Sequence, residues 1–303
     1  MGKKSKKAGK KSQGGERNIS PGRARRERIK SIKEMHSRIE ELLERKEREL
    51  KDVSALASFE KQEDCPICLL PLPVNHGETF YRTCCGKTIC CGCFIQESKR
   101  VSDRSVLKCE FCREEIPCSE DMASPSSIGR CKKRAVNGDL NTLCVLGEIM
   151  SENNDVPKAA TYHVQAAELG HAESFCCLAS MYYAGDFGRG KDNDTATAIR
   201  LAKVAAKYGR RRAHFMLWTY TMLRARDLKD DSRERYRTCE ESIKHLVYGA
   251  SGGNKECMAK LKKVVELGPF RQEAFERAEA AFNEAMRKEW SEARQEFTDL
   301  DIL

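Results

Sequence analysis

The sequence lacks any long apolar run. No stretch approaches the roughly 18 apolar residues that a helix needs to cross a bilayer, and the N-terminus has no apolar segment of the kind that directs secretion. We therefore expect a protein of the cytoplasm or nucleus, not secreted and with no membrane partner. Outside the secretory pathway disulfides are disfavoured, so the 16 cysteines are expected to be reduced. Met1-Gly2 begins like a myristoylation signal, but Lys6 stands where that signal needs Ser or Thr.

Acidic residues are scarce at the N-terminus. Residues 1–30 contain seven Lys and five Arg against two Glu, a net charge of +10, which leaves −1 for the rest of a chain whose total is +9. Residues 1–24 have almost nothing apolar to bury and predict a disordered basic tail. Its lysine run, Lys3 to Lys11, is open to three interpretations: a nuclear-import signal, a nucleic-acid contact or a solubilising segment.

Glycine and proline are absent from residues 25–56, and apolar side chains recur there at helical spacing. We predict a charged helix over residues 25–60. The apolar positions follow a heptad seam that His36 and Lys46 interrupt. Two interpretations stay open: a short coiled-coil dimer, or a solvated helix that leads into the next domain.

Cysteine, by contrast, is abundant in one segment. Ten of the 16 cysteines lie between Cys65 and Cys118, and eight of them form four pairs: Cys65/Cys68, Cys84/Cys85, Cys90/Cys93 and Cys109/Cys112. Three pairs have C-x2-C spacing, and the fourth is an adjacent doublet. Eight thiolates suffice for two tetrahedral Zn²⁺ sites, and a segment this short and polar needs the metal in order to fold.

The spacing is C-x2-C-x15-C-C-x4-C-x2-C-x15-C-x2-C, which resembles an all-cysteine variant of the RING finger. The resemblance implies a small zinc-stabilised α+β domain over residues 62–118 with a cross-brace, in which pairs one and three share one ion and pairs two and four share the other. The implied ligand sets are Cys65, Cys68, Cys90 and Cys93 for the first zinc, and Cys84, Cys85, Cys109 and Cys112 for the second.

The doublet departs from the usual pattern, which has a histidine among the central ligands. Adjacent side chains point in opposite directions, so both thiols reach one ion only through a kink, and Gly86 permits one. A competing assignment uses one doublet cysteine with His76. Cys91 and Cys118 lie outside the pattern as bystander thiols, although Cys91 replaces a neighbour if the register slips. A plant-homeodomain finger would need a His and a Trp near the last pair, and separate zinc ribbons would need sequential pairs.

The RING resemblance implies an E3 ubiquitin ligase that binds a ubiquitin-charged conjugating enzyme (E2) without a covalent intermediate, with E2 and ubiquitin as partners. The residues that it implies for these contacts are Ile67, Leu69, Phe94, Arg113 and Pro117. Two family features are missing, because Glu110 occupies the position of a proline and the groove tryptophan is absent. Ordinary packing of a zinc core is the alternative role for Ile67 and Phe94, and a solvated charge is the alternative for Arg113.

Residues 119–128 are rich in Ser and Pro and predict a linker. Residues 129–295 are Ala-rich with helical periodicity, and Gly170, Gly209 and Gly253 recur 39 and 44 residues apart in similar contexts. The segments Ala172–Gly185 and Ala198–Gly209 resemble the Sel1-like repeat, a relative of the tetratricopeptide repeat. This resemblance implies an all-α solenoid of helix-turn-helix units whose concave face takes a protein substrate or adaptor. An irregular helical bundle is the alternative.

The predicted fold is therefore multidomain: a disordered basic tail, a charged helix, a RING cross-brace and a Sel1-like solenoid. The predicted function is ubiquitin ligation, with two Zn²⁺ as cofactors. A non-catalytic zinc-dependent scaffold is the first alternative. Nucleic-acid association is the second, and it rests on the tail alone, because basic and aromatic residues are not interleaved elsewhere.

Overall fold

The computed structural model describes residues 21–56, 58–75, 77–100, 106–117, 124–188, 190–228, 233–267 and 272–299. This part of the chain is mostly helical, with two small antiparallel hairpins in the cysteine-rich segment. The elements are α1 (Pro21–Glu49), β1 (Thr79–Tyr81), β2 (Thr88–Cys90), α2 (Cys91–Arg100), β3 (Val106–Lys108), β4 (Glu115–Pro117), α3 (Pro125–Val136), α4 (Leu140–Glu152), α5 (Val156–Glu168), α6 (Ala172–Ala184), α7 (Lys191–Lys207), α8 (Arg211–Arg226), α9 (Arg233–Ser251), α10 (Lys255–Leu267), α11 (Gln272–Glu289) and α12 (Glu292–Asp299).

Helix α1 begins earlier and ends earlier than predicted. Residues 21–24, expected in the tail, are helical, while the chain beyond Glu49 leaves the helix well before residue 60. Its apolar stripe packs against α5 and α7, where Met35, Ile39, Leu42 and Leu43 are buried. The face that a coiled-coil partner or solvent was expected to cover is therefore covered by this chain's own helices.

The two polar interruptions of the seam have partners in this packing. His36 Nδ1 lies 2.5 Å from the hydroxyl of Tyr182, and Lys46 Nζ donates to Glu49 at 2.8 Å. Arg200 of α7 also reaches α1, where it makes a two-pronged contact with Glu47 at 2.8 and 3.0 Å. His36 is thus explained by a contact with another helix that the local sequence does not reveal, whereas Lys46 pairs within α1.

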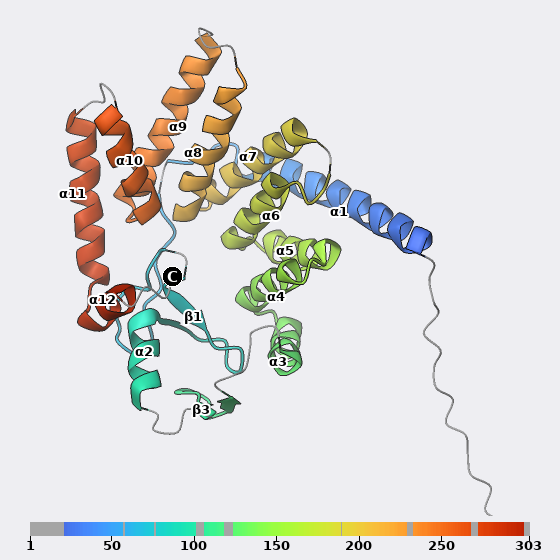
Figure 1. The fold of residues 1–303 in the computed structure, drawn as a ribbon, viewed down its shortest axis with the longest axis vertical. Coiled ribbons are helices and arrows are strands. Elements are labelled where there is room, and N and C mark those ends of the chain that lie inside the picture. Colours follow the sequence, from blue (N-terminus) through green and yellow to red (C-terminus); the bar gives the residue numbers. More distant parts are fainter. Residues whose placement is uncertain are drawn as a thin grey trace, which may run out of the picture.

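Helices α4 to α9 form three consecutive helix pairs, and α10 and α11 both pack against α9 (Figure 1). The three predicted repeat glycines follow α5, α7 and α9, and all have left-handed φ of +84° to +87°. Each glycine N–H donates to the carbonyl three residues earlier, and the next N–H donates to the carbonyl five residues earlier. This is the Schellman ending, which ordinary side chains disfavour. Helix α3 ends in the same way at Gly138, so a fourth inter-helix loop has this ending.

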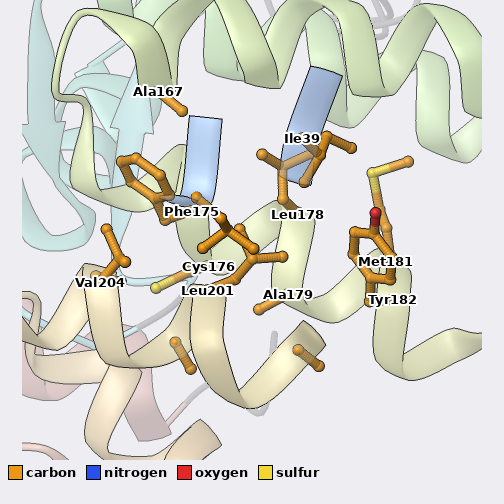
Figure 2. Close-up of a cluster of buried hydrophobic side chains, with 14 of the residues drawn as sticks. Ile39, Ala167, Phe175, Cys176, Leu178, Ala179, Met181, Tyr182, Leu201 and Val204 are labelled. Carbon is orange, nitrogen blue, oxygen red and sulfur yellow. The ribbon is translucent and has the colours of Figure 1, made fainter. Parts of the chain in front are cut away.

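The core of the helical part combines small and large side chains. Ala179, Ala198, Ala202 and Ala205 are fully buried where α6 and α7 meet, and they let the two axes approach closely. Phe175, Leu178, Met181 and Tyr182 fill the remaining space beside α1 (Figure 2). Each such large side chain contributes about 1.5–3 kcal/mol on full burial.

The predicted Ser/Pro linker is shorter than residues 119–128. Helix α3 begins at Pro125, and the side chain of Ser124 accepts from the N–H of Ser127. Serine at the cap followed by proline in the first turn is a favourable helix start, so this Ser-Pro dipeptide begins a helix. Residues 119–123 of the predicted linker lie outside the described ranges.

The cysteine-rich segment lies between the two ends of the curved helical array (Figure 1). At the first end, the hydroxyl of Tyr81 donates to Asp139 at 3.0 Å, and Arg130 donates to Thr83 at 3.2 Å. At the other end, α12 packs against α2. The two ends of the array are thereby linked through the cysteine-rich segment. No helix within the described ranges is long and apolar enough to span a bilayer.

Candidate metal centres

Two groups of four cysteines converge in the segment between residues 65 and 112. The first group takes two thiols from the turn before β1, one from the end of β2 and one from α2, and its members are Cys65, Cys68, Cys90 and Cys93. The second takes two thiols from each of two turns, and its members are Cys84, Cys85, Cys109 and Cys112. These are the two sets that the RING resemblance implies. His76 and Cys118, the alternative ligand and one bystander, lie outside the described residues.

The spacing of the sulfur atoms suits a small tetrahedral ion. The Sγ atoms lie 3.8 Å apart in Cys65/Cys93 and in Cys68/Cys90, and 3.6 Å apart in Cys85/Cys109. A tetrahedral ion with metal–sulfur bonds of about 2.3 Å places its ligands about 3.8 Å apart. In each group all four sulfurs lie within 4.8 Å of one another. Each group can therefore hold one metal ion, and the all-thiol donor set is consistent with zinc.

Three turns of the same design bring these thiols together. They span residues 65–70, 82–87 and 109–114. In each, the first N–H donates to the sixth carbonyl at 2.8–2.9 Å, and the fifth N–H donates to the first carbonyl at 2.7–3.0 Å. The fifth residue is left-handed in all three turns: Leu69, Gly86 and Arg113 have φ of 59°, 74° and 64°. The kink that the doublet required is thus present at Gly86, where Arg82 takes the place of the first cysteine.

The turns also affect the acidity of the thiols. Burial opposes ionisation of Cys65, but backbone N–H groups of Cys68, Cys90 and Ile67 outweigh it and lower the pKa of Cys65 to about 7. Cys109 shows the same balance, with N–H groups of Cys112 and Phe111 lowering its pKa. Burial raises the pKa of Cys68, Cys84, Cys85 and Cys93. Four thiolates in one group therefore need a bound cation to stay ionised together.

Two arginines lie against the cysteine groups, and sequence reasoning missed both. Arg82 and Glu110 form a two-pronged ion pair, with Nε to Oε2 at 3.2 Å and each side chain only 12% exposed. The pair joins two turns of the second group. Arg294 of α12 donates to the Pro71 carbonyl at 2.9 Å and lies 3.6 Å from Cys68 Sγ. A four-thiolate site with a divalent ion carries a net charge of −2, and the buried guanidinium of Arg294 offsets half of it at the first group.

Three of the five predicted contact residues are exposed. Leu69 and Ile67, on the first turn, are 75% and 38% exposed, and Arg113 on the third turn is exposed as well. Leu69 and Arg113 occupy equivalent positions of their turns. The first turn therefore presents two apolar side chains to solvent, and the third presents a cation.

The other two predicted contact residues have structural surroundings of their own. Phe94 of α2 is half-buried and stacks on Phe80 with ring centroids 4.0 Å apart, while Arg82 lies over its ring. Pro117 ends β4 and pairs with Val106 in the second hairpin. Cys91, the other bystander, is buried beside Phe80 and belongs to neither group of four. The packing interpretation of Phe94 thus has direct geometric support.

The fold and site define a mostly helical protein with two four-cysteine groups that can hold metal ions. Comparison with protein families matches residues 2–117 to the SIP5 protein N-terminal domain. The match ends with β4, so it covers α1 and both cysteine groups and stops before the helical array. No curated protein and no solved structure matches the chain.

Proposed function

We propose that this chain is a RING-type E3 ubiquitin ligase. The observation that supports it most is the interleaving of the cysteine pairs, since pair one lies with pair three and pair two with pair four. An interleaved arrangement needs both ions for one compact unit, as in a cross-brace, whereas separate zinc ribbons close sequential pairs. In this proposal each group of four binds one Zn²⁺, which supplies folding free energy to a segment with few buried apolar residues.

Catalysis in this proposal depends on orientation. Ile67 and Leu69 contact the conjugating enzyme through their exposed apolar surface, and Arg113 contacts both that enzyme and ubiquitin. Holding the thioester in one pose lowers the entropic part of the barrier, so no nucleophile is required from this chain. The zinc-bound thiolates keep their structural role throughout.

The helical array recruits the substrate or an adaptor in this proposal. The helix endings at Gly170, Gly209 and Gly253 support repeated helix pairs, and the stacked pairs offer a curved surface. A cavity of about 540 Å³ lies where the array faces the cysteine-rich segment, lined by residues that include Lys61, Asn141, Glu173, Arg210 and Arg212. Its mixed charge suits a polar peptide better than an apolar one.

The basic tail adds an import signal in this proposal, which predicts loss of nuclear accumulation on removal of residues 1–20.

Autoubiquitination with a panel of conjugating enzymes tests the ligase directly. We expect the reaction in the wild type and at least a tenfold loss in Ile67→Ala, Leu69→Ala and Arg113→Ala, with metal content unchanged. Leu169→Ala is the matched control, because Leu169 is 65% exposed in a turn of the helical array. Activity that is unaffected by all three substitutions would reject these contact residues.

A non-catalytic metal-dependent scaffold is the second candidate, and one observation favours it. Helix α12 packs on α2, the helix that carries Phe94, one of the residues predicted to contact the conjugating enzyme. Phe94 and Glu110 are also occupied by contacts within the chain. A wild type that binds two metal ions but supports no ubiquitin transfer with any conjugating enzyme would favour the scaffold over the ligase.

A further inference from the structure

A third group of metal-ligand side chains lies in the helical array, away from the two cysteine groups. It combines Cys144 of α4, His163 of α5 and Cys177 of α6, whose ligand atoms all lie within 4.8 Å of one another. The two Sγ atoms are 3.9 Å apart. This distance is close to the about 3.8 Å expected between two sulfurs on one tetrahedral zinc.

The histidine of this group is buried without full hydrogen bonding. His163 is 1% exposed, and its Nδ1 finds no hydrogen-bond partner among the described residues. A buried polar atom left in this state costs free energy, and an unseen ion is one of its common explanations. Gly147 of α4 makes room for the ring, because a Cβ at that position would lie 2.4 Å from Cε1 of His163. Helix α4 therefore accommodates the imidazole at the expense of a side chain of its own.

A fourth donor and an entry route are present on the same side. Glu148 lies one turn after Cys144 on α4, and its Oε1 is 3.8 Å from Cys177 Sγ. Cys144 and Glu148 both line the cavity of about 540 Å³ described above, and Glu148 is exposed there. An ion from solvent thus reaches Cys144 through the cavity, with the Glu148 carboxylate beside it.

We propose that Cys144, Cys177 and His163 bind a third Zn²⁺, with Glu148 as the fourth ligand. Two thiolates, one imidazole and one carboxylate form a donor set that zinc accepts with tetrahedral geometry. The ion joins three consecutive helices, α4, α5 and α6, so its binding free energy stabilises the junction of the first two helix pairs. The site is independent of the ligase, and its existence does not depend on ubiquitin transfer.

Metal analysis of the full chain tests the third site. We expect the double variant Cys144→Ala/Cys177→Ala to hold one zinc fewer per chain than the wild type, and Glu148→Gln to weaken that ion at least tenfold against a chelator. Cys239→Ala is the matched control, because Cys239 is a half-buried cysteine of α9 outside all three groups, and it is expected to keep the wild-type content. An unchanged zinc content in the double variant would overturn the third site.

A measurement on the wild type avoids any folding defect of the variants. Cadmium NMR of the cadmium-loaded chain gives one resonance per site, and fewer sulfur ligands move the resonance upfield. We expect one resonance upfield of those from the four-sulfur groups. Its absence overturns the proposal, as does a disulfide between Cys144 and Cys177 found by peptide mapping of protein purified without reductant. If the upfield resonance is present and the four-sulfur resonances are absent, the cysteine cross-brace is rejected and the third site is supported.

Discussion

At the residue scale, Leu69 and Arg113 occupy a backbone conformation that suits glycine. Both have left-handed φ at the fifth position of their turns, where Gly86 stands in the doublet turn. A non-glycine residue there costs about 1 kcal/mol. We predict that Arg113→Gly is about 1 kcal/mol more stable than Arg113→Ala, measured by urea unfolding of the metal-loaded chain, because both remove the cation and only glycine relieves the strain.

Ubiquitin transfer separates this backbone effect from function. Both variants at position 113 are expected to lose transfer to the same extent. If Arg113→Gly retained ubiquitin transfer, the cation would have no part in the reaction.

The sequence indicated the kink at Gly86, because glycine after the doublet is a local signal. It gave no sign of the same conformation at Leu69 and Arg113, where the turn hydrogen bonds hold ordinary side chains in place.

Two buried histidines make the stability of the array depend on pH. The Nδ1 atoms of His214 and His245 lie 3.2 Å apart. Burial lowers the pKa of His214 to about 3, assisted by His245, and burial lowers the pKa of His245 to about 4, with Lys203 assisting and Glu241 opposing. In the unfolded chain both bind protons near pH 6.5. The stability that the two neutral histidines contribute is therefore present above about pH 6.5 and is lost as the pH falls toward 4.

Urea unfolding at pH 7.5 and 5.5 measures this dependence. Each histidine is expected to cost about 1.4 kcal/mol between the two conditions, since the unfolded state takes up the proton and the folded state does not. The double variant His214→Gln/His245→Gln should lose about 2.7 kcal/mol less than the wild type over the same interval. An equal loss in both proteins would mean that these histidines are protonated in the fold.

At the element scale, the contact between α2 and α12 depends on one glycine. A Cβ on Gly92 would lie 2.8 Å from the backbone nitrogen of Arg294 and 2.9 Å from the carbonyl carbon of Ala293. Backbone atoms cannot move aside as a side chain does, so Gly92→Ala is predicted to displace α12 from α2. Hydrogen exchange of residues 292–299 should increase at least tenfold. If α12 blocks the conjugating enzyme, ubiquitin transfer increases in the same variant.

Gly129→Ala supplies the control for this substitution. Gly129 is also helical, and a Cβ there meets nothing within 4 Å among the described residues. It is expected to leave both exchange and transfer unchanged. Equal effects of the two substitutions would assign the change to helix propensity instead of to α12.

The sequence predicted some elements well, because their signals are local. Gly170, Gly209 and Gly253 end helices in the predicted places, since a Schellman ending needs left-handed backbone at a single residue. The packing of α1 was missed for the opposite reason. Its apolar stripe and its His36 fit a dimer partner, solvent or distant helices equally well on sequence alone, and only the tertiary contact with Tyr182 decides among them.

At the scale of the whole molecule, the cysteine-rich segment closes the arc of the helices. On the side of this segment, Tyr81 donates to Asp139. Arg294 donates to the Pro71 carbonyl and lies beside Cys68. Asp139 and Arg294 lie at opposite ends of the array. The RING resemblance implied the grouping of the eight thiols, and that resemblance rests on cysteine spacings that are local in the sequence. The role of Arg294 did not, since 226 residues separate it from Cys68. Contacts between residues so far apart along the chain leave no periodic signal in a single sequence.

Metal removal is predicted to open this closed arrangement without unfolding the helical core. The main core is built from α1 and helices α5 to α8, and neither group of four cysteines contributes a side chain to it. Under reducing conditions, a chelator should therefore leave most of the far-ultraviolet helix signal in place. Proteolysis should become at least tenfold faster between residues 64 and 117.

Small-angle scattering of the same sample should show a larger radius of gyration, because loss of the folded turns releases both ends of the arc. The variant Cys65→Ser/Cys109→Ser is expected to reproduce this opening without a chelator, since it removes one ligand from each group of four. Arg82→Ala is the useful comparison, because it breaks the buried pair with Glu110 while keeping all eight thiols. A cooperative loss of the helix signal together with the metal would show that the cysteine groups and the array fold as one unit.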